Sequence, residues 1–471
     1  MNIKGHLHIH PIVLLIPLCL YFFTFCVFTP HAFALSIEDE KVLGEKFLAQ
    51  MRTHFEVVKD DFANEFINDL GEYLITPLET KPFPFHFYFI KDDTLNAFAA
   101  PGGNIFIFSG LVEVTESVDE LASIICHEIG HVSARHLAQR LEQNKKIGLA
   151  TMAGILAGVL IGGPAAEALV TGSLAAGIQT QLYYSRNDER QADQLGFKYM
   201  KSAAFDPRGM VSILKKIERG NWLGADKPPA YLMTHPTGPE RMANLDTLLS
   251  GYVREYSRAE AERFRALFSF IKTVLRAKCM DSNEAERQFT LELKKDPNSY
   301  LPHFGLGIVY KERAEYALAI HHLNTALERE PASVSVPILT KLGEAYQGNG
   351  QDREAILVLE RALKFSEGDS SILFLMGLSY ENLEEYDKAI TLFERLASFK
   401  PVKNEVYYRL GISYGKRKML ALAHYNFGVY FKAVGEQEKA RFHFRKAEGL
   451  SGTDHALKRK IKRITEGPPV R

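Results

Sequence analysis

The stretch 127–131 reads His-Glu-Ile-Gly-His, which is the pattern H-E-x-x-H. On a helix, residues four positions apart lie on one face, and this spacing allows two imidazoles to bind one zinc ion. Glu128 points toward the same metal, where we expect it to take a proton from water rather than to bind the ion. Ser117, three residues before Glu120, predicts a capping box that starts this helix. The pattern therefore predicts a zinc hydrolase site, and the reaction it indicates is peptide-bond hydrolysis.

A third zinc ligand must lie elsewhere in the chain, because zinc in hydrolases usually takes three protein ligands. The metzincin pattern is excluded, since the positions that it requires to be Gly and His hold Ala134 and Leu137. His136 is expected to turn away on a continuing helix and to be a polar surface residue. Glu189 and Asp193 are four apart on one helical face, so one carboxylate can bind the metal while the other fixes the tautomer of a ligand histidine.

These motifs, together with the segment 96–103 (Asn-Ala-Phe-Ala-Ala-Pro-Gly-Gly), resemble the M48 family of zinc metallopeptidases. The resemblance implies a zincin-like α+β domain that binds one Zn²⁺ per chain, with His127, His131 and Glu189 as its ligands. It also implies that the strand containing Asn96, Ala97 and Phe98 lies at the lip of the cleft. There an extended substrate would add by main-chain pairing.

His235 is a further candidate for this site. The dipeptide His235-Pro236 and Arg241 match the family pattern, and the residue before a proline is extended, so the imidazole is presented from a loop. His235 could occupy the open zinc position at rest, or it could stabilise the oxyanion during hydrolysis. A plain structural histidine stays open as a third interpretation. Arg241 is expected to tie its helix to the rest of the domain.

Periodicity outlines the fold of the first half, residues 36–250. Apolar residues recur at helical spacing between residues 43 and 70, and then alternate over 85–90 and 105–108. With the Asn96 segment, these two runs predict a three-stranded sheet directly before the H-E-x-x-H helix.

The second half, residues 252–465, is repetitive. A Leu-Gly or Met-Gly pair followed by Tyr recurs around Gly307, Gly343, Gly377 and Gly411, at a spacing of about 34 residues. This period predicts an all-α tetratricopeptide-repeat solenoid whose concave side binds peptides or proteins.

Composition limits the partners and the destination of the chain. Its 471 residues exceed one usual hydrophobic core, and 57 Lys and Arg balance 57 Asp and Glu, so no overall field recruits nucleic acid. An uncharged run over 12–28 and the sequence 32–34 (Ala-Phe-Ala) predict a signal peptide at 1–34, cleaved after Ala34, with an uncleaved anchor as the alternative. Cys126 and Cys279, which follow it, do not indicate a disulfide framework, and Cys126 is expected in the core.

The segment 147–178 carries a single charged residue, Glu167. The sequence 162–164 (Gly-Gly-Pro) divides it into pieces shorter than the roughly 20 residues that span a membrane. Three interpretations stay open: buried or flap helices over the cleft, an interfacial hairpin that touches a membrane or a partner, and a transmembrane segment.

A signal peptide, an M48 domain and C-terminal repeats together resemble the periplasmic β-barrel assembly-enhancing proteases. This resemblance implies quality control of misfolded or stalled outer-membrane proteins, with partners in the barrel-assembly machinery. The alternative is a chaperone-like adaptor that acts through its repeats with little proteolysis. The presence of His127, Glu128, His131 and Glu189 favours an active zinc metalloendopeptidase.

Overall fold

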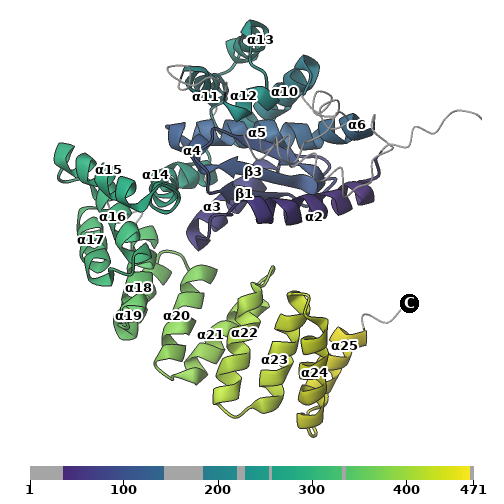
Figure 1. Ribbon diagram of the computed structural model, residues 1–471, viewed down its shortest axis with the longest axis vertical. Helices are drawn as coiled ribbons and strands as arrows, with labels where there is room; N and C mark the ends of the chain where they lie inside the picture. Colours follow the sequence, from purple (N-terminus) through teal and green to yellow (C-terminus); the bar gives the residue numbers. More distant parts are fainter. Residues whose placement is uncertain (1–34, 143–183, 220–228, 254–256, 331–335, 467–471) are drawn as a thin grey trace, which may run out of the picture.

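The computed structural model describes residues 35–142, 184–219, 229–253, 257–330 and 336–466. The expected signal peptide at 1–34 and the apolar segment at 147–178 lie outside the described residues, so both stay predictions. The chain forms an N-terminal part with helices around a small sheet, followed by an all-helical solenoid (Figure 1). The predicted α+β domain followed by an all-α repeat domain is confirmed.

The N-terminal part contains three strands and several helices in the order that the sequence periodicity predicts. Its elements are α2 (Ile37–His54), α3 (Asp61–Leu74), β1 (His86–Ile90), β2 (Ala97–Ala100), η1 (Pro101–Gly103), β3 (Asn104–Phe108), α4 (Ser109–Val114), α5 (Val118–Ser133), α6 (His136–Glu142), α10 (Arg186–Ser202), α11 (Arg208–Arg219), α12 (Ala230–Thr234) and α13 (Pro239–Ser250).

The sheet has the order β1-β3-β2. β3 pairs in parallel with β1 and antiparallel with β2, with Phe98 opposite Phe106. One face of the sheet packs Phe98 and Phe106 against Phe47 of α2, and the other packs Ile105 and Ile107 into the core that contains α5. β2 is therefore an edge strand of this sheet, next to the helix that carries the H-E-x-x-H sequence.

The start of α5 differs from the expected capping box in one half. The Ser117 hydroxyl accepts the Glu120 N–H, as expected. The Glu120 carboxylate, however, accepts the N–H of Glu116 and the ammonium of Lys216, and not the N–H of Ser117. The predicted hydrogen bond from the Ser117 N–H to the Glu120 carboxylate is therefore wrong. The buried carboxylate instead pairs with Lys216 of α11, whose Nζ lies 2.7 Å from Glu120 Oε1. A complete capping box forms instead at Ser185 and starts α10.

The solenoid consists of antiparallel helix pairs. Its helices are α14 (Ala259–Cys279), α15 (Ser282–Lys295), α16 (Tyr300–Glu312), α17 (Tyr316–Arg329), α18 (Val336–Gly348), α19 (Asp352–Leu363), α20 (Ser370–Asn382), α21 (Tyr386–Ser398), α22 (Asn404–Lys416), α23 (Leu420–Ala433), α24 (Gln437–Leu450) and α25 (His455–Glu466). The recurring glycines lie where two helices of a pair touch. A Cβ atom at Gly377 would lie 2.6 Å from the ring of Phe393, so only glycine permits this contact.

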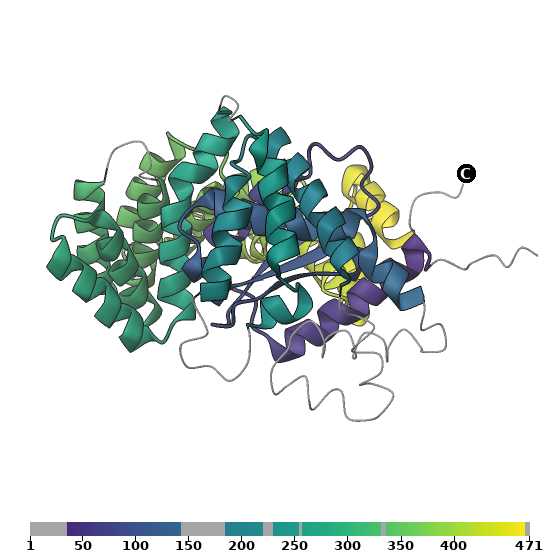
Figure 2. The same ribbon diagram turned by 90° about the horizontal axis from the view of Figure 1, so that it is seen from above.

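The first solenoid helix is part of the core of the N-terminal part. α14 packs against α3, α4 and α5, and the ring of its Phe264 lies 5.7 Å from that of Phe66 on α3. Arg265 of α14 also bonds Asp119 of α5. In Figure 1 the later repeats curve beneath the N-terminal part, and Figure 2, seen from above, shows the two parts overlapping.

Two polar contacts between residues far apart in the sequence join the later repeats to α3. Lys341 Nζ of α18 lies 2.6 Å from Asp60 Oδ2, and both side chains are buried. Burial raises the pKa of Asp60, but the ammonium groups of Lys341 and Lys278 together outweigh it, and the net pKa is lowered. The Glu65 carboxylate of α3 accepts the hydroxyls of Ser370 and Ser371 at 2.9 and 2.7 Å. These contacts fix the repeats against the N-terminal part.

Candidate active site

Four potential ligand side chains converge between α5, α10 and the loop after α12. One ligand atom each from His127, His131, Glu189 and His235 lies within 4.8 Å of the others, and all four residues are buried. The structure thus brings together the helical histidine pair, the downstream carboxylate and the loop histidine that the sequence pointed to.

The distances inside this cluster are short. His131 Nε2 lies 3.0 Å from His127 Nε2, and each of these atoms lies 3.4 Å from a Glu189 oxygen. His235 Nδ1 lies 3.0 Å from Glu189 Oε1 and 3.3 Å from His127 Nε2. The Nε2 atoms of both H-E-x-x-H histidines therefore face the centre of the cluster.

Close contact between α5 and α10 brings Glu189 to the histidines. A Cβ atom at Gly130 would lie 2.8 Å from the Ala192 carbonyl oxygen, so the glycine within the H-E-x-x-H sequence lets the helices approach. Ser185 caps α10 and fixes its first turn, in which Glu189 lies. Burial raises the pKa of Glu189, but His235, Arg241 and His127 outweigh it and hold this pKa well below its usual range.

Asp193 and Arg241 support His127 from outside the cluster. Asp193 Oδ1 accepts from His127 Nδ1 at 2.9 Å, which leaves Nε2 as the ligand nitrogen. Arg241 donates Nε and Nη2 to the two Asp193 oxygens, and its Nη1 lies 2.7 Å from Glu189 Oε2. Arg241 thus ties α13 to α10, as expected, and it also contacts a residue of the cluster.

The two histidines of the H-E-x-x-H sequence differ in their electrostatics. Burial and Arg241 lower the pKa of His127, but Glu189 and Asp193 outweigh both and raise it to about 9. Burial, by contrast, lowers the pKa of His131 well below its ordinary value. The two carboxylates therefore stabilise positive charge at His127, whether a proton or a metal ion supplies it.

His136 is a correction to the sequence analysis. It is 1% exposed and not a surface residue. The reason is that α5 ends at Ser133 and Arg135 adopts a φ of 54°, so the chain turns sharply before α6 begins at His136. His136 Nδ1 lies 2.9 Å from His131 Nδ1, and its Nε2 lies 3.0 Å from Gln191 Oε1. Donation from His131 to His136 and from His136 to Gln191 leaves His131 Nε2 free to bind a metal.

Two tyrosines that the sequence analysis did not single out enclose the imidazoles. The ring centroid of Tyr184 lies 3.8 Å from that of His131, and the Tyr231 ring stacks on His235 at 4.7 Å. Burial and the nearby Glu128 and Glu189 raise the pKa of Tyr184 well above its ordinary value, so its hydroxyl stays protonated. The sequence offers one indication of this role for Tyr184, which is its place directly before Ser185, the N-cap of the helix that carries Glu189.

The helix that precedes His235, α12, is also attached to the chain before β2. The Tyr231 N–H donates to the Leu95 carbonyl at 3.1 Å, directly before Asn96 and the edge strand. Asn96, Ala97 and Phe98 are all buried, with 0% exposure each. A substrate that pairs with this edge would therefore have to uncover it first.

Glu128 and the donor set fit a zinc ion. Both Glu128 oxygens are buried and make no hydrogen bond with the described residues, although His235 Nε2 lies 3.5 Å from Oε1. Buried, unsatisfied carboxylate oxygens are costly unless a cation or water pairs with them. Imidazole nitrogens with one carboxylate are the ligands that zinc takes in hydrolases, and the cluster supplies them.

Comparison with known proteins agrees with this geometry. Residues 63–249 match Peptidase family M48. The chain contains an M48 peptidase domain. Tetratricopeptide-repeat families match residues 336–369 and 372–398, within the solenoid. Both parts of the predicted architecture are therefore confirmed.

Three curated relatives carry the names of proteases. The chain is 34% identical over 214 residues to the beta-barrel assembly-enhancing protease of Yersinia pestis, and 33% identical over 214 residues to that of Escherichia coli (strain K12). Each match covers 45% of this chain and 44% of the relative, so the chain spans less than half of the length of these relatives.

The mitochondrial metalloendopeptidase OMA1 of Schizosaccharomyces pombe is 24% identical over 262 residues, which are 53% of this chain and 75% of that protein. Among solved structures, MamA protein aligns with 41% of this chain and 89% of its own at 21% identity. Its TM-score of 0.25 is too low to support an inference.

Proposed function

We propose that this protein is an exported, zinc-dependent endopeptidase with protein-binding repeats. We further propose that it acts in the periplasm on misfolded or stalled outer-membrane proteins. The observation that carries the proposal is the convergence of His127, His131 and Glu189 with Glu128 beside them, inside an M48 domain. All the side chains that this chemistry needs are present and buried together.

His127, His131 and Glu189 would hold the ion. Bound zinc would supply a Lewis acid that polarises the scissile carbonyl and lowers the pKa of a water. Glu128 is the general base, which takes a proton from the attacking water and returns it to the leaving amine. Asp193 and His136 hold His127 and His131 with Nδ1 protonated, so that both present Nε2.

His235 is proposed as a fourth ligand that closes the site at rest. Its Nδ1 approaches both Glu189 and His127, and the Tyr231 ring and the Tyr231–Leu95 hydrogen bond hold it there. Because that hydrogen bond ends directly before β2, withdrawal of α12 would free both the metal and the start of the edge strand. A substrate strand that adds to Asn96–Phe98 would then reach an open site.

The cellular role rests on the relatives and on the sequence. The names of the two beta-barrel assembly-enhancing proteases cited above support a role in β-barrel assembly, and the predicted signal peptide supports export. Protein substrates, and contact with the barrel-assembly machinery through the repeats, complete this proposal. Nucleic acid is not an expected partner. None of the described helices is both long and apolar enough to cross a lipid bilayer. Peripheral membrane contact through 147–178 stays a prediction.

The alternative function is that of a chaperone-like adaptor in which the repeats act and proteolysis is minor. Casein cleavage by the purified full chain separates the two. The peptidase proposal expects cleavage that a zinc chelator abolishes, that added zinc restores, and that Glu128→Gln removes. Glu79→Gln, a change outside the cluster, is the matched control and should cleave normally. Equal activity of Glu128→Gln and the unmodified chain would refute the peptidase proposal.

A further inference from the structure

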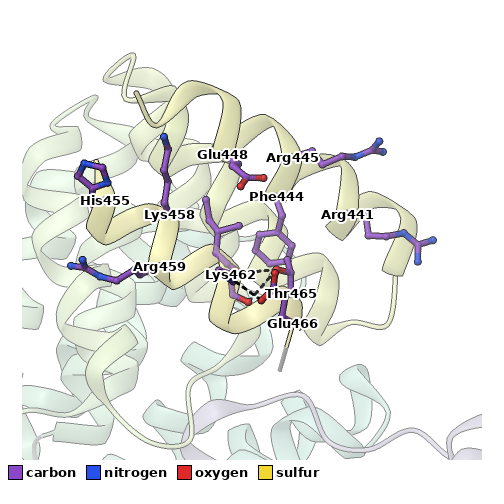
Figure 3. Close-up of a pocket in the computed structure, with 11 residues that line it drawn as sticks. Arg441, Phe444, Arg445, Glu448, His455, Lys458, Arg459, Lys462, Thr465 and Glu466 are labelled. Carbon is purple, nitrogen blue, oxygen red and sulfur yellow. Dashed lines mark hydrogen bonds and ion pairs between the residues drawn. The ribbon is translucent and has the colours of Figure 1, made fainter. Parts of the chain in front are cut away.

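A hollow of about 800 Å³ lies between the last two described helices, α24 and α25. Figure 3 shows Phe444 and Thr465 between these helices, while Arg441 and Arg445 extend outward from α24. Lys458, Arg459 and Lys462 of α25 also line it. This hollow lies on the solenoid and uses none of the residues of the M48 site.

Its position is where another repeat would stack. The buried small residues Ala319, Ala355, Ala389 and Ala423 recur at the repeat period, and buried Leu457 holds the same position in α25. In α23 the residues that follow Ala423 receive α24. His424 Nδ1 lies 2.9 Å from His443 Nδ1, and the glycine at 428 lies against the Phe444 ring.

The matching positions in α25 are basic. One repeat period after His424, Tyr425 and Gly428 come Lys458, Arg459 and Lys462, and all three line the hollow. At the positions that contact the next helix, α23 therefore has aromatic side chains and a glycine, whereas α25 has basic side chains. Every residue that lines the hollow comes from α24 or α25, and no described helix follows α25.

Charge is concentrated here and not spread evenly. Residues 437–466 contain nine Lys and Arg against four Asp and Glu, whereas the whole chain has 57 of each. Lys462 lies 3.7 Å from Glu466, but Arg441, Arg445 and Arg459 make no ion pair with the described residues. A helix that only caps the end of a solenoid needs a soluble outer surface, and side chains of both charges provide one. Five Lys and Arg side chains line the hollow against two carboxylates, those of Glu448 and Glu466, and this excess of positive charge favours a partner of opposite charge.

We propose that the hollow between α24 and α25 is a docking site for an acidic amphipathic helix of a partner protein, which stacks on the solenoid as the next repeat helix would. Its apolar stripe would meet Phe444 and Ile461, and its carboxylates would pair with Arg445, Arg459 and Lys462. The geometry of the preceding repeats supplies the mode of packing, and the basic rim supplies the choice of partner.

The test uses the full chain with Glu128→Gln, so that the probe is not cut. The probe is a fluorescent peptide of about 20 residues with Leu at helical spacing and Glu elsewhere, and binding is read by anisotropy. We expect saturable binding that weakens at least tenfold in Arg459→Glu/Lys462→Glu. Arg353→Glu/Arg361→Glu, which reverses two exposed charges on α19, should leave binding unchanged.

Two further probes make the result decisive. A peptide with the Glu residues replaced by Lys should bind Arg459→Glu/Lys462→Glu better than the unmodified chain, which also shows that this variant is folded. A peptide of the same composition with scrambled Leu positions should bind at least fivefold more weakly. The proposal is overturned by equal binding of the scrambled peptide, by equal losses in both charge variants, or by binding of anionic phosphatidylglycerol vesicles without binding of the acidic peptide.

Discussion

His235 Nδ1 lies 3.0 Å from Glu189 Oε1, so a loop residue after α12 and a helical residue of α10 meet at the same point of the cluster. Catalytic zinc sites keep one position open, whereas structural sites are filled by four protein ligands. With His235 in place the cluster offers four potential ligands, which is the basis of the proposal that the site is closed at rest.

Replacing His235 tests this closure. We expect His235→Ala to retain metal, to cleave casein several-fold faster and to digest itself, because the fourth position becomes free. His86→Ala, an exposed histidine on β1, is the control. A fall in kcat of roughly 10²-fold or more would instead assign His235 to oxyanion stabilisation. Unchanged activity would leave it a structural residue.

Metal content tests the ligand assignment. The purified chain should hold about one zinc, and His127→Ala, His131→Ala and Glu189→Ala should each lower the occupancy. Glu128→Gln should not, because we propose Glu128 as the base and not as a ligand. Full occupancy in Glu189→Ala would contradict its role. The double variant Glu189→Ala/His235→Ala would then show whether His235 replaces it.

His136 should act on metal affinity through His131. His136→Leu removes the acceptor for His131 Nδ1, and we expect zinc affinity to fall by about 10- to 100-fold. Competition with a chelator of known affinity measures it. His136→Asn, which keeps an acceptor, should recover part of the loss. His54→Leu, on the exposed end of α2, should have no effect. Equal affinities in the Leu and Asn variants would rule out a tautomer role.

Truncation tests the division of labour. A chain that ends after Cys279 keeps α14 and should cleave a short unstructured peptide while losing most activity on a folded protein, since the repeats raise the local substrate concentration. A chain that ends at Ser250 should be unstable, because the partners of Phe66 and Asp119 on α14 are missing. Comparable losses of the Cys279 chain on both substrates would mean that the repeats complete the active site.

The buried pair Asp60–Lys341 should stabilise both parts together. Asp60→Asn keeps a helix cap but removes one of the two carboxylates that pair with Lys341, the other being Glu344 at 2.8 Å, and we expect a loss on the order of 2 kcal/mol in the free energy of unfolding. Asp61→Asn, which faces exposed Lys403, should lose little. The double variant Asp60→Asn/Lys341→Met should be more stable than Asp60→Asn alone, because it removes the buried ammonium that has lost a carboxylate partner, while Glu344 keeps Lys311 at 2.6 Å.

The pH dependence of this contact follows from the pKa directions. The lowered pKa of Asp60 means that its contribution is present above the unfolded pKa of about 3.9 and is lost as the pH falls through the folded value. Burial lowers the pKa of Lys341, but Glu344 and Asp60 outweigh it and raise it, so its contribution is lost only as the pH rises past about 10.4. The effect of Asp60→Asn on thermal unfolding should therefore be constant from about pH 5 to pH 9. A steep change within that window would show that another group dominates.

Local spacing predicted the fold and part of the site. Two histidines four apart on one helix face, and the glycine period of the repeats, depend on neighbours along the chain and can be read from it. Glu189 was assigned by resemblance, since spacing allowed either it or Asp193. The prediction that His136 lies on the surface was wrong, because no neighbouring residue in the sequence indicated that the helix would end before Arg135. The contacts of Tyr184, Tyr231 and Lys341 join distant segments, which a single sequence does not reveal.

The contact between Lys341 and Asp60 spans 281 residues of sequence and leaves little freedom between the two parts. A flexible tether would deliver any bound protein to Glu128 in every orientation. A solenoid held against α3 instead keeps a constant offset between the captured segment and the scissile bond. Cleavage would then occur at a fixed distance from the segment that binds the repeats. Cleavage sites in different substrates would share this distance and not a common sequence.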